Sequence, residues 1–553
     1  MPDSLNATRL QVIWNRLLAI VEEQGQALIR AAFSPIVREC GDISAGLFDA
    51  QGRMLAQAVT GTPGHINTMA AAVQALRAHF PTQSLQPGDI VMTNDPWLAS
   101  GHLNDFLLMM PAFHHGRIIG YSACTSHLVD LGGKGMGPLG EDIFDEGLLL
   151  PPCKLVEAGA VNQLLLDIVK ANGREPIANA GDIYALIAAC EAGATRLAAM
   201  LAEFKLPDLT AIGEHIIQTS KAGTLDAIAH LPNGTYSHAM TIDGYDQPLT
   251  LQAALTIHDD GVAVDFTGTS PCSRYGINVP LNYATAYSVF ALRCIIGPDI
   301  PNNAGSLEPF TVDGPKGCIL NAQHPSPVAM RHTIGQMTPD LMFGCLVQAC
   351  PDLVPAEGAA TMYDLPLRSA PEVAQAGKAT FAIELTHNGG TGARPTKDGL
   401  SATAFPSGVW GSQVEMTETV APVLIKRREL IQDSGGAGQF RGGLGQRIEL
   451  QTRDDHPMTL FLSVDRTIYP AQGRFGGHPG AVGSARIGNG AKLPSKGEFT
   501  IAGGETLYFA TPGGGGYGNP AERDDEKIKA DVLDGTISAA AARDLYGWNG
   551  SDD

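Results

Sequence analysis

The densest run of residues that could do chemistry lies between positions 94 and 133. It contains the segment Gly101-His102-Leu103-Asn104-Asp105 and, further along, His127-Leu128-Val129-Asp130. Two imidazoles with one or two carboxylates make a mixed nitrogen and oxygen ligand set, which suits Zn²⁺ or Mn²⁺ better than Mg²⁺. The spacing carries no signature such as HExxH, so capping and turn roles for these residues are the alternative interpretation.

A β-hairpin is the element that would position these side chains. Phe106–Phe113 and Ile118–Cys124 are strand-like and flank the turn His114-His115-Gly116. The candidate residues precede the first strand and follow the second, and antiparallel pairing brings those outer ends together. We therefore expect four side chains to meet at one rim: His102, Asp105, His127 and Asp130.

Two polar residues outside the hairpin are weaker candidates. Asp42 precedes a predicted strand and could be a fourth ligand, although a capping role is commoner. His65 precedes a predicted helix and could face substrate, although a lone histidine there is usually structural. We take His65 and Asp130 as candidate catalytic residues, with Asp130 orienting His127. A nearby acidic run is interpreted as an exposed face: Glu141, Asp142, Asp145 and Glu146.

Two glycine-rich loops invite a nucleotide-binding interpretation. GGAGQFRGG at 435–443 is followed by the strand-like segment 446–451, so no helix N-terminus is available to hold phosphate. GGGG at 513–516 lacks the Lys-Ser/Thr pair of a phosphate-binding loop. We predict that both loops are turns, and we expect no ATP site in this chain.

Hydrophobic periodicity and turn signals predict a mixed α/β (α+β) fold with several domains and many glycine-rich loops. The predicted helices span 8–32, 69–79, 180–204, 207–230, 282–296 and 333–350. The predicted strands outside the hairpin include 43–48, 53–59, 90–93, 235–242, 249–258 and 262–266. We expect an N-terminal α/β domain with the metal site at 1–230, a middle α/β domain at 231–430, and a glycine-rich β region with a C-terminal helix at 431–553.

Composition excludes several functional classes. Lys and Arg number 37 against 57 Asp and Glu, a formal net charge of −20 that argues against nucleic-acid binding. No stretch approaches about 18 consecutive apolar residues, so no membrane-spanning helix is expected. The start Met1-Pro2-Asp3 has no basic region, which argues against a secretory signal. The nine cysteines form no CxxC pair and indicate a reducing compartment, so we expect a cytoplasmic protein.

Several ordered motifs resemble one family. From about Thr8 to Pro520, the chain resembles the B-type subunit of the hydantoinase/oxoprolinase superfamily, which is related to the alpha subunit of acetone carboxylase. The matching motifs are Cys40-Gly41-Asp42-Ile43-Ser44, NDPW at 94–97, GHLND at 101–105, HLVDLGG at 127–133, DEGLLLPPCKL at 145–155, DSGGAGQFRGGLG at 433–445 and TPGGGGYGNP at 511–520. The family string Gly-Thr-His-Leu-Pro-Asp is Ser100-Gly101-His102-Leu103-Asn104-Asp105 here, which keeps the His and the Asp.

The resemblance implies a division of labour between two proteins of a complex. A separate A-type subunit would bind ATP with Mg²⁺ and phosphorylate a carbonyl or amide oxygen of the substrate. This chain would hold a Zn²⁺ or Mn²⁺ ion where the activated substrate reacts. By motif, the implied ligands are His102, Asp105 and His127, with Asp42 as a plausible fourth.

The expected function is therefore ATP-dependent hydrolysis of a hydantoin-like, oxoproline-like or lactam ring, together with an A-type partner. One alternative is a subunit of a ketone carboxylase, although the alpha chains of carboxylases tend to be longer than this one. Another is a non-catalytic scaffold for the A-type subunit. Convergent imidazoles argue against a scaffold, which has no use for them.

Overall fold

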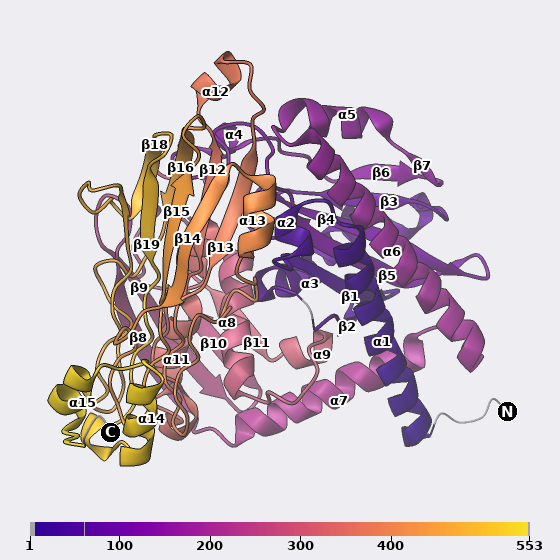
Figure 1. The fold of residues 1–553 in the computed structure, drawn as a ribbon. Coiled ribbons are helices and arrows are strands. Elements are labelled where there is room, and N and C mark those ends of the chain that lie inside the picture. Colours follow the sequence, from indigo (N-terminus) through magenta and orange to yellow (C-terminus); the bar gives the residue numbers. More distant parts are fainter. Residues whose placement is uncertain (1–5, 60, 551–553) are drawn as a thin grey trace.

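The computed structural model describes residues 6–59 and 61–550 (Figure 1). Within these residues the strands form one seven-stranded sheet and three four-stranded sheets, flanked by helices. The predicted mixed α/β fold is thereby confirmed. Met1–Asp3, on which the expectation about a secretory signal rests, lie outside the described residues.

The N-terminal part is built around the antiparallel seven-stranded sheet, in the order β2-β1-β5-β4-β3-β6-β7. The predicted hairpin is confirmed as β4 and β5, and it pairs Asp105 directly with His127. The strands are β1 (Ile43–Asp49), β2 (Met54–Gln57), β3 (Ile90–Thr93), β4 (Asp105–His114), β5 (Arg117–His127), β6 (Cys153–Glu157) and β7 (Ala160–Val161).

Both faces of this sheet are covered by helices. Helices α1 (Ala7–Ala31) and α6 (Pro176–Phe204) pack on one face, and α3 (Pro63–His79) packs on the other. Neighbouring strand residues therefore enter different cores: Leu47 joins the core under α1 and α6, whereas Phe48 joins the core under α3. The strands of a sheet that is buried on both faces are nearly continuously apolar. In agreement with this, all seven residues of β1 are buried. The remaining helices of this part are α2 (Pro35–Arg38), α4 (Ile143–Glu146), α5 (Gln163–Asn172) and α7 (Thr210–Ala229).

Helix α6 is long and apolar enough, by length and composition alone, to cross a membrane. No such helix was expected from the sequence, which has no stretch of about 18 consecutive apolar residues. In the structure, 56% of its most apolar window is buried, and the helix packs against α1, β4 and β5. The core helix of a soluble protein meets the same criterion, so this feature is weak evidence for a membrane span.

The middle part contains a four-stranded sheet in the order β11-β10-β9-β8, with α8 and α11 beside it. The helix predicted over 333–350 is replaced by two shorter ones, α10 and α11. The elements are β8 (Gly234–Ile242), β9 (Leu249–His258), β10 (Gly261–Asp265), β11 (Phe310–Asp313), α8 (Leu281–Ile295), α9 (Ala304–Leu307), α10 (Arg331–Gly335) and α11 (Thr338–Leu346).

The C-terminal part has two four-stranded sheets, β13-β12-β16-β18 and β14-β15-β19-β17, which share one hydrophobic core. Strands from both sides of the predicted boundary near residue 431 therefore pack together. The strands are β12 (Tyr363–Ser369), β13 (Ala382–His387), β14 (Val423–Leu430), β15 (Gln446–Thr452), β16 (Met458–Ser463), β17 (Ser484–Ile487), β18 (Lys496–Ile501) and β19 (Thr506–Ala510). The helices are α12 (Pro371–Gln375), α13 (Val414–Val420), α14 (Asp525–Leu533) and α15 (Ala539–Tyr546).

The glycine-rich loops are mostly straight chain segments that pack backbone against backbone, which corrects the prediction of turns. The Gly443 amide donates to the Thr391 carbonyl, and the Gly514 amide donates to the Gly443 carbonyl, both at 2.9 Å. A Cβ atom on Gly514 would lie 1.9 Å from the Thr391 oxygen. Glycine is needed here because a neighbouring backbone occupies the place of a side chain.

Candidate metal centre

Asp105 lies at the centre of a buried cluster at the open end of the β4–β5 hairpin. Its Oδ1 atom is 2.8 Å from His102 Nε2 and 3.2 Å from His127 Nδ1. One ligand atom from each of the three residues lies within 4.8 Å of the others, and all three side chains are buried. The convergence follows from strand register, because Asp105 and His127 are paired and His102 lies three residues before Asp105.

The protonation of His102 supports a cation at this place. Its Nδ1 atom is 3.1 Å from the Ala329 carbonyl oxygen, which can only accept, so Nδ1 carries the proton. Burial, together with the charge of Arg331, lowers the pKa of His102 to about 3, so the ring is neutral. The Nε2 lone pair then faces the Asp105 carboxylate without a hydrogen bond. Two lone pairs at this distance repel, and a metal ion between them would turn the repulsion into coordination.

His127 is held by a carboxylate that the sequence analysis missed. Its Nε2 atom is 3.1 Å from Glu384 Oε1, which comes from β13 in the C-terminal part. Burial disfavours the charged ring, but the carboxylates of Glu384 and Asp105 together outweigh it and raise the pKa of His127 well above its usual value. A carboxylate behind a histidine is the arrangement that orients metal-binding imidazoles.

Asp42 and His65 complete the cluster. His65 Nε2 is 2.9 Å from Asp105 Oδ2 and 3.5 Å from Asp42 Oδ1. Asp42 Oδ2 is 3.9 Å from His127 Nδ1, so Asp42 is near enough to act as a fourth ligand. His65 lies in the first turn of α3, whose N-cap is the Thr62 hydroxyl. The structure thus brings together five of the six predicted site residues.

Arg331 is a second residue that the sequence analysis did not identify. Its Nη2 atom is 2.7 Å from Asp105 Oδ2, and its Nε atom donates to the Ser100 carbonyl oxygen. The guanidinium also lies 4.3 Å from the centre of the Tyr283 ring. Burial raises the pKa of Asp105, but His102, His65 and Arg331 outweigh it and hold that pKa well below its usual value.

Asp130, the sixth predicted site residue, is not brought into the cluster. Its Oδ1 atom accepts from the amides of Gly132 and Arg174, and its Oδ2 atom accepts from Arg174 Nη1 at 2.8 Å. These bonds fasten the loop after β5 to the start of α6. The expected contact with His127 is replaced by an ion pair with Arg174, so we assign Asp130 a structural role.

Glu146 corrects the interpretation of the acidic run as an exposed face. Its side chain is buried, and Oε1 accepts from the amides of Val328 and Ala329 at 2.7 and 2.9 Å. Burial raises the pKa of Glu146 to about 8. Since the Ala329 carbonyl accepts from His102, Glu146 fixes the segment that sets the orientation of that ring.

Comparison with known proteins identifies similar chains over the whole length. The family model described as hydantoinase B/oxoprolinase matches residues 6–520. A protein of Pseudomonas sp. (strain NS671), named as the B-type subunit of a "Putative D-/L-hydantoinase", is 30% identical over 566 residues, covering 97% of this chain and 94% of that one.

Two solved structures have the same fold. The ATP-dependent caprolactamase from Pseudomonas jessenii matches with a TM-score of 0.90 and 26% identity, over 100% of this chain and 98% of that chain. A nucleotide-free acetone carboxylase, from work on ATP-dependent acetone carboxylation, matches with a TM-score of 0.87 and 20% identity, over 99% and 81%. The second likeness shows the fold alone.

Proposed function

Because the chain belongs to the hydantoinase B/oxoprolinase family, we propose that it is the B-type subunit of an ATP-dependent hydrolase of cyclic amides. Relatives and structural neighbours include a protein named as the B-type component of a hydantoinase and an ATP-dependent caprolactamase. An A-type partner would bind ATP and phosphorylate the amide oxygen of the ring. A ring amide is a poor electrophile, and phosphorylation turns it into an imidate with a good leaving group.

The observation that carries this proposal is the unpartnered lone pair of His102 facing Asp105. We assign a divalent transition metal, Zn²⁺ or Mn²⁺, to His102, Asp105 and His127, with Asp42 as the fourth ligand. When bound, such an ion lowers the pKa of water to about 7 and polarises phosphoryl or carbonyl oxygens.

The residues of this chain have distinct tasks in the proposed reaction. Arg331 and His65 hold Asp105 Oδ2, which leaves Oδ1 directed towards His102 and His127. Glu384 accepts from His127 Nε2 and fixes the orientation of the ring. We keep His65 as a candidate catalytic residue because its Nε2 atom lies 2.9 Å from Asp105 Oδ2 and 3.5 Å from Asp42 Oδ1.

Elemental analysis of the purified chain tests the metal assignment without any assay of activity. We expect close to one equivalent of transition metal in the wild type, and far less in His102→Ala and His127→Ala. The exposed residue His230, changed to Ala, is the matched control and should retain the metal. Undiminished metal in both cluster variants would exclude this site.

Turnover with the partner tests the reaction class. With an A-type partner and ATP, the proposal expects ring opening that does not depend on bicarbonate. ATP turnover that requires bicarbonate, with a ketone as substrate, would instead establish a carboxylase. The acetone carboxylase likeness shows the fold alone, so it does not favour that second candidate.

A further inference from the structure

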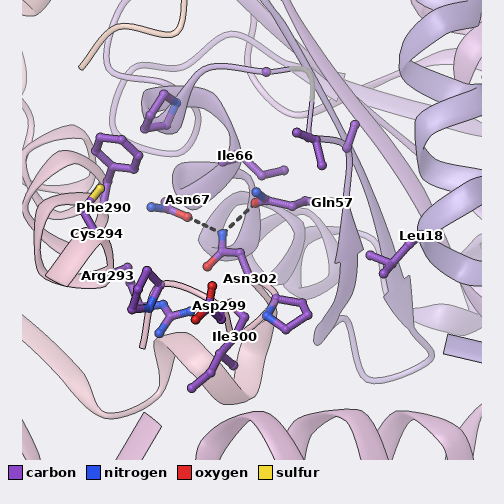
Figure 2. Close-up of a pocket in the computed structure, with 16 residues that line it drawn as sticks. Leu18, Gln57, Ile66, Asn67, Phe290, Arg293, Cys294, Asp299, Ile300 and Asn302 are labelled. Carbon is purple, nitrogen blue, oxygen red and sulfur yellow. Dashed lines mark hydrogen bonds between the residues drawn. The ribbon is translucent and has the colours of Figure 1, made fainter. Parts of the chain in front are cut away.

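A cavity of about 630 Å³ is lined by residues of the N-terminal and middle parts (Figure 2). Its volume falls in the range of about 300–1,000 Å³ that is typical of small-molecule sites. Its walls come from α1, from the connection between β2 and α3, and from the end of α8 with the loop that follows. The apolar part of the wall is made by Leu18, Ile66, Phe290, Pro298, Ile300 and Pro301.

Three carboxamides form the polar part of this pocket. Asn302 Nδ2 donates to Gln57 Oε1 at 2.6 Å and to Asn67 Oδ1 at 2.9 Å (Figure 2). Asn67 Nδ2 in turn donates to the Ala286 carbonyl. This pattern leaves Gln57 Nε2 as a donor and Asn302 Oδ1 as an acceptor, neither with a partner in the described residues. Neither atom is sealed from solvent, so both are available to a ligand.

The charges around the pocket favour a neutral ligand. Arg293 lines it, but its Nη1 and Nη2 atoms donate to the carbonyl oxygens of Ile296 and Ile300, which fixes the rim. Asp299 adds an exposed carboxylate to the lining. A phosphate or carboxylate ligand would therefore meet the negative charge of Asp299 and an arginine whose Nη1 and Nη2 atoms both already donate to main-chain carbonyls.

We propose that this pocket binds an uncharged cyclic amide or ureide. This inference rests on the function proposed above and adds a second place where the same class of substrate is held. A ring amide is fixed in the cis form, so its C=O and N–H lie side by side. The C=O accepts from Gln57 Nε2, the N–H donates to Asn302 Oδ1, and the ring carbons pack against the apolar wall.

The pocket is separate from the metal cluster, and the two share helix α3. Pro63, Ile66 and Asn67 face the pocket from the first turn of α3, at the spacing that places residues on one side of a helix. His65, in the same turn, directs its ring to Asp105. Helix α3 therefore carries both a wall of the pocket and one residue of the cluster.

Binding to the isolated chain tests the pocket with neither ATP nor partner. The probe is 2-piperidone, followed by saturation-transfer NMR and calorimetry on protein treated with a chelator. We expect binding, and a loss of about two- to tenfold in affinity for Gln57→Leu, which removes the donor. Gln26→Leu, an exposed glutamine on α1, is the matched control and should bind like the wild type. N-methyl-2-piperidone lacks the N–H and should bind more weakly to the wild type, an arm that needs no variant.

The outcomes separate this inference from the proposed function. His102→Ala is expected to bind 2-piperidone as the wild type does. Binding lost in His102→Ala but unchanged in Gln57→Leu would locate the ligand at the metal cluster and overturn the pocket. No binding at all, or equal affinity for the N-methyl analogue, would also overturn it. Ring opening with the partner and ATP tests the proposed function independently of these results.

Discussion

His102 and His127 share the Asp105 carboxylate but have different partners on the other ring nitrogen. A main-chain carbonyl fixes the proton of His102 on Nδ1 and leaves Nε2 bare, whereas His127 lies between Asp105 and Glu384. Glu384 is thus the residue that decides how His127 presents its Nδ1 atom to the cluster.

The first prediction is therefore that Glu384→Gln weakens metal binding about 10- to 100-fold, the usual effect of removing a carboxylate behind a histidine ligand. Titration of metal into the apo protein, followed by calorimetry, measures it. Glu372→Gln, on the exposed side of α12, is the control and should keep wild-type affinity. Wild-type affinity in Glu384→Gln would contradict the role assigned to Glu384.

The second prediction concerns Glu146 and the pH dependence of stability. The unfolded chain releases this proton near pH 4.3, roughly the ordinary value, whereas the folded chain keeps it up to about pH 8. Between these values the folded state binds more protons, so Glu146 lowers the free energy of unfolding as pH rises. Glu146→Gln keeps the Oε1 acceptor for Val328 and Ala329 but cannot ionise.

Thermal unfolding from about pH 4 to pH 8 measures this difference. At about pH 4 the variant and the wild type should have similar melting temperatures. As the pH rises to about 8, the melting temperature of Glu146→Gln should increase relative to that of the wild type. Glu141→Gln, exposed in the same acidic run, should show a flat difference. A flat difference for Glu146→Gln as well would show that the folded protein does not retain this proton.

Only part of the cluster could be predicted from the sequence. His102, Asp105 and His127 were identified because hairpin pairing converts sequence order into proximity. Glu384 and Arg331 lie more than 200 residues from the hairpin along the chain, and neither stands in a recognisable local pattern. Asp130 lies three residues after His127, as a residue that orients this histidine could, but its carboxylate contacts Arg174 instead.

At the scale of elements, the regular helices and strands were predictable because their periodicity is local. Helix α1 begins and ends within one residue of the predicted range. The glycine-rich segments were not predictable in this way. Some glycines are needed for a tight turn, and others are needed because another backbone segment passes close by. A single sequence does not distinguish these two cases, because the difference lies in tertiary contacts.

The third prediction tests that distinction. In Gly514→Ala the new Cβ would lie 1.9 Å from the Thr391 oxygen, so the packed segments must separate. We expect a loss of about 3 kcal/mol or more in the free energy of unfolding, measured with urea. Gly213→Ala in α7 is the control: its Cβ would contact Leu55 at an ordinary 3.4 Å. Alanine is a better helix former, so that variant should gain about 0.5–1 kcal/mol. Equal stability of the two variants would contradict close packing.

At the scale of the whole molecule, the cluster draws on all three parts of the chain. The N-terminal part supplies His102 from the loop before β4, Asp105 from β4 and His127 from β5. Helix α10 supplies Arg331, and strand β13 of the C-terminal part supplies Glu384. The centre therefore forms only when the three parts are packed together.

The last prediction is that this chain alone neither hydrolyses ATP nor opens a ring. A phosphate-binding loop needs free backbone amides, whereas the amides of Gly436, Gly443, Gly514 and Gly516 donate to carbonyl oxygens of neighbouring segments. Phosphate release from ATP and Mg²⁺ by the purified, metal-loaded chain should equal the background, and an A-type partner should restore both phosphate release and ring opening. His102→Ala combined with the partner serves as the control, because it should impair ring opening while leaving the ATP site of the partner intact. Sustained phosphate release from the chain without a partner would place an ATP site in this chain and refute the division of labour.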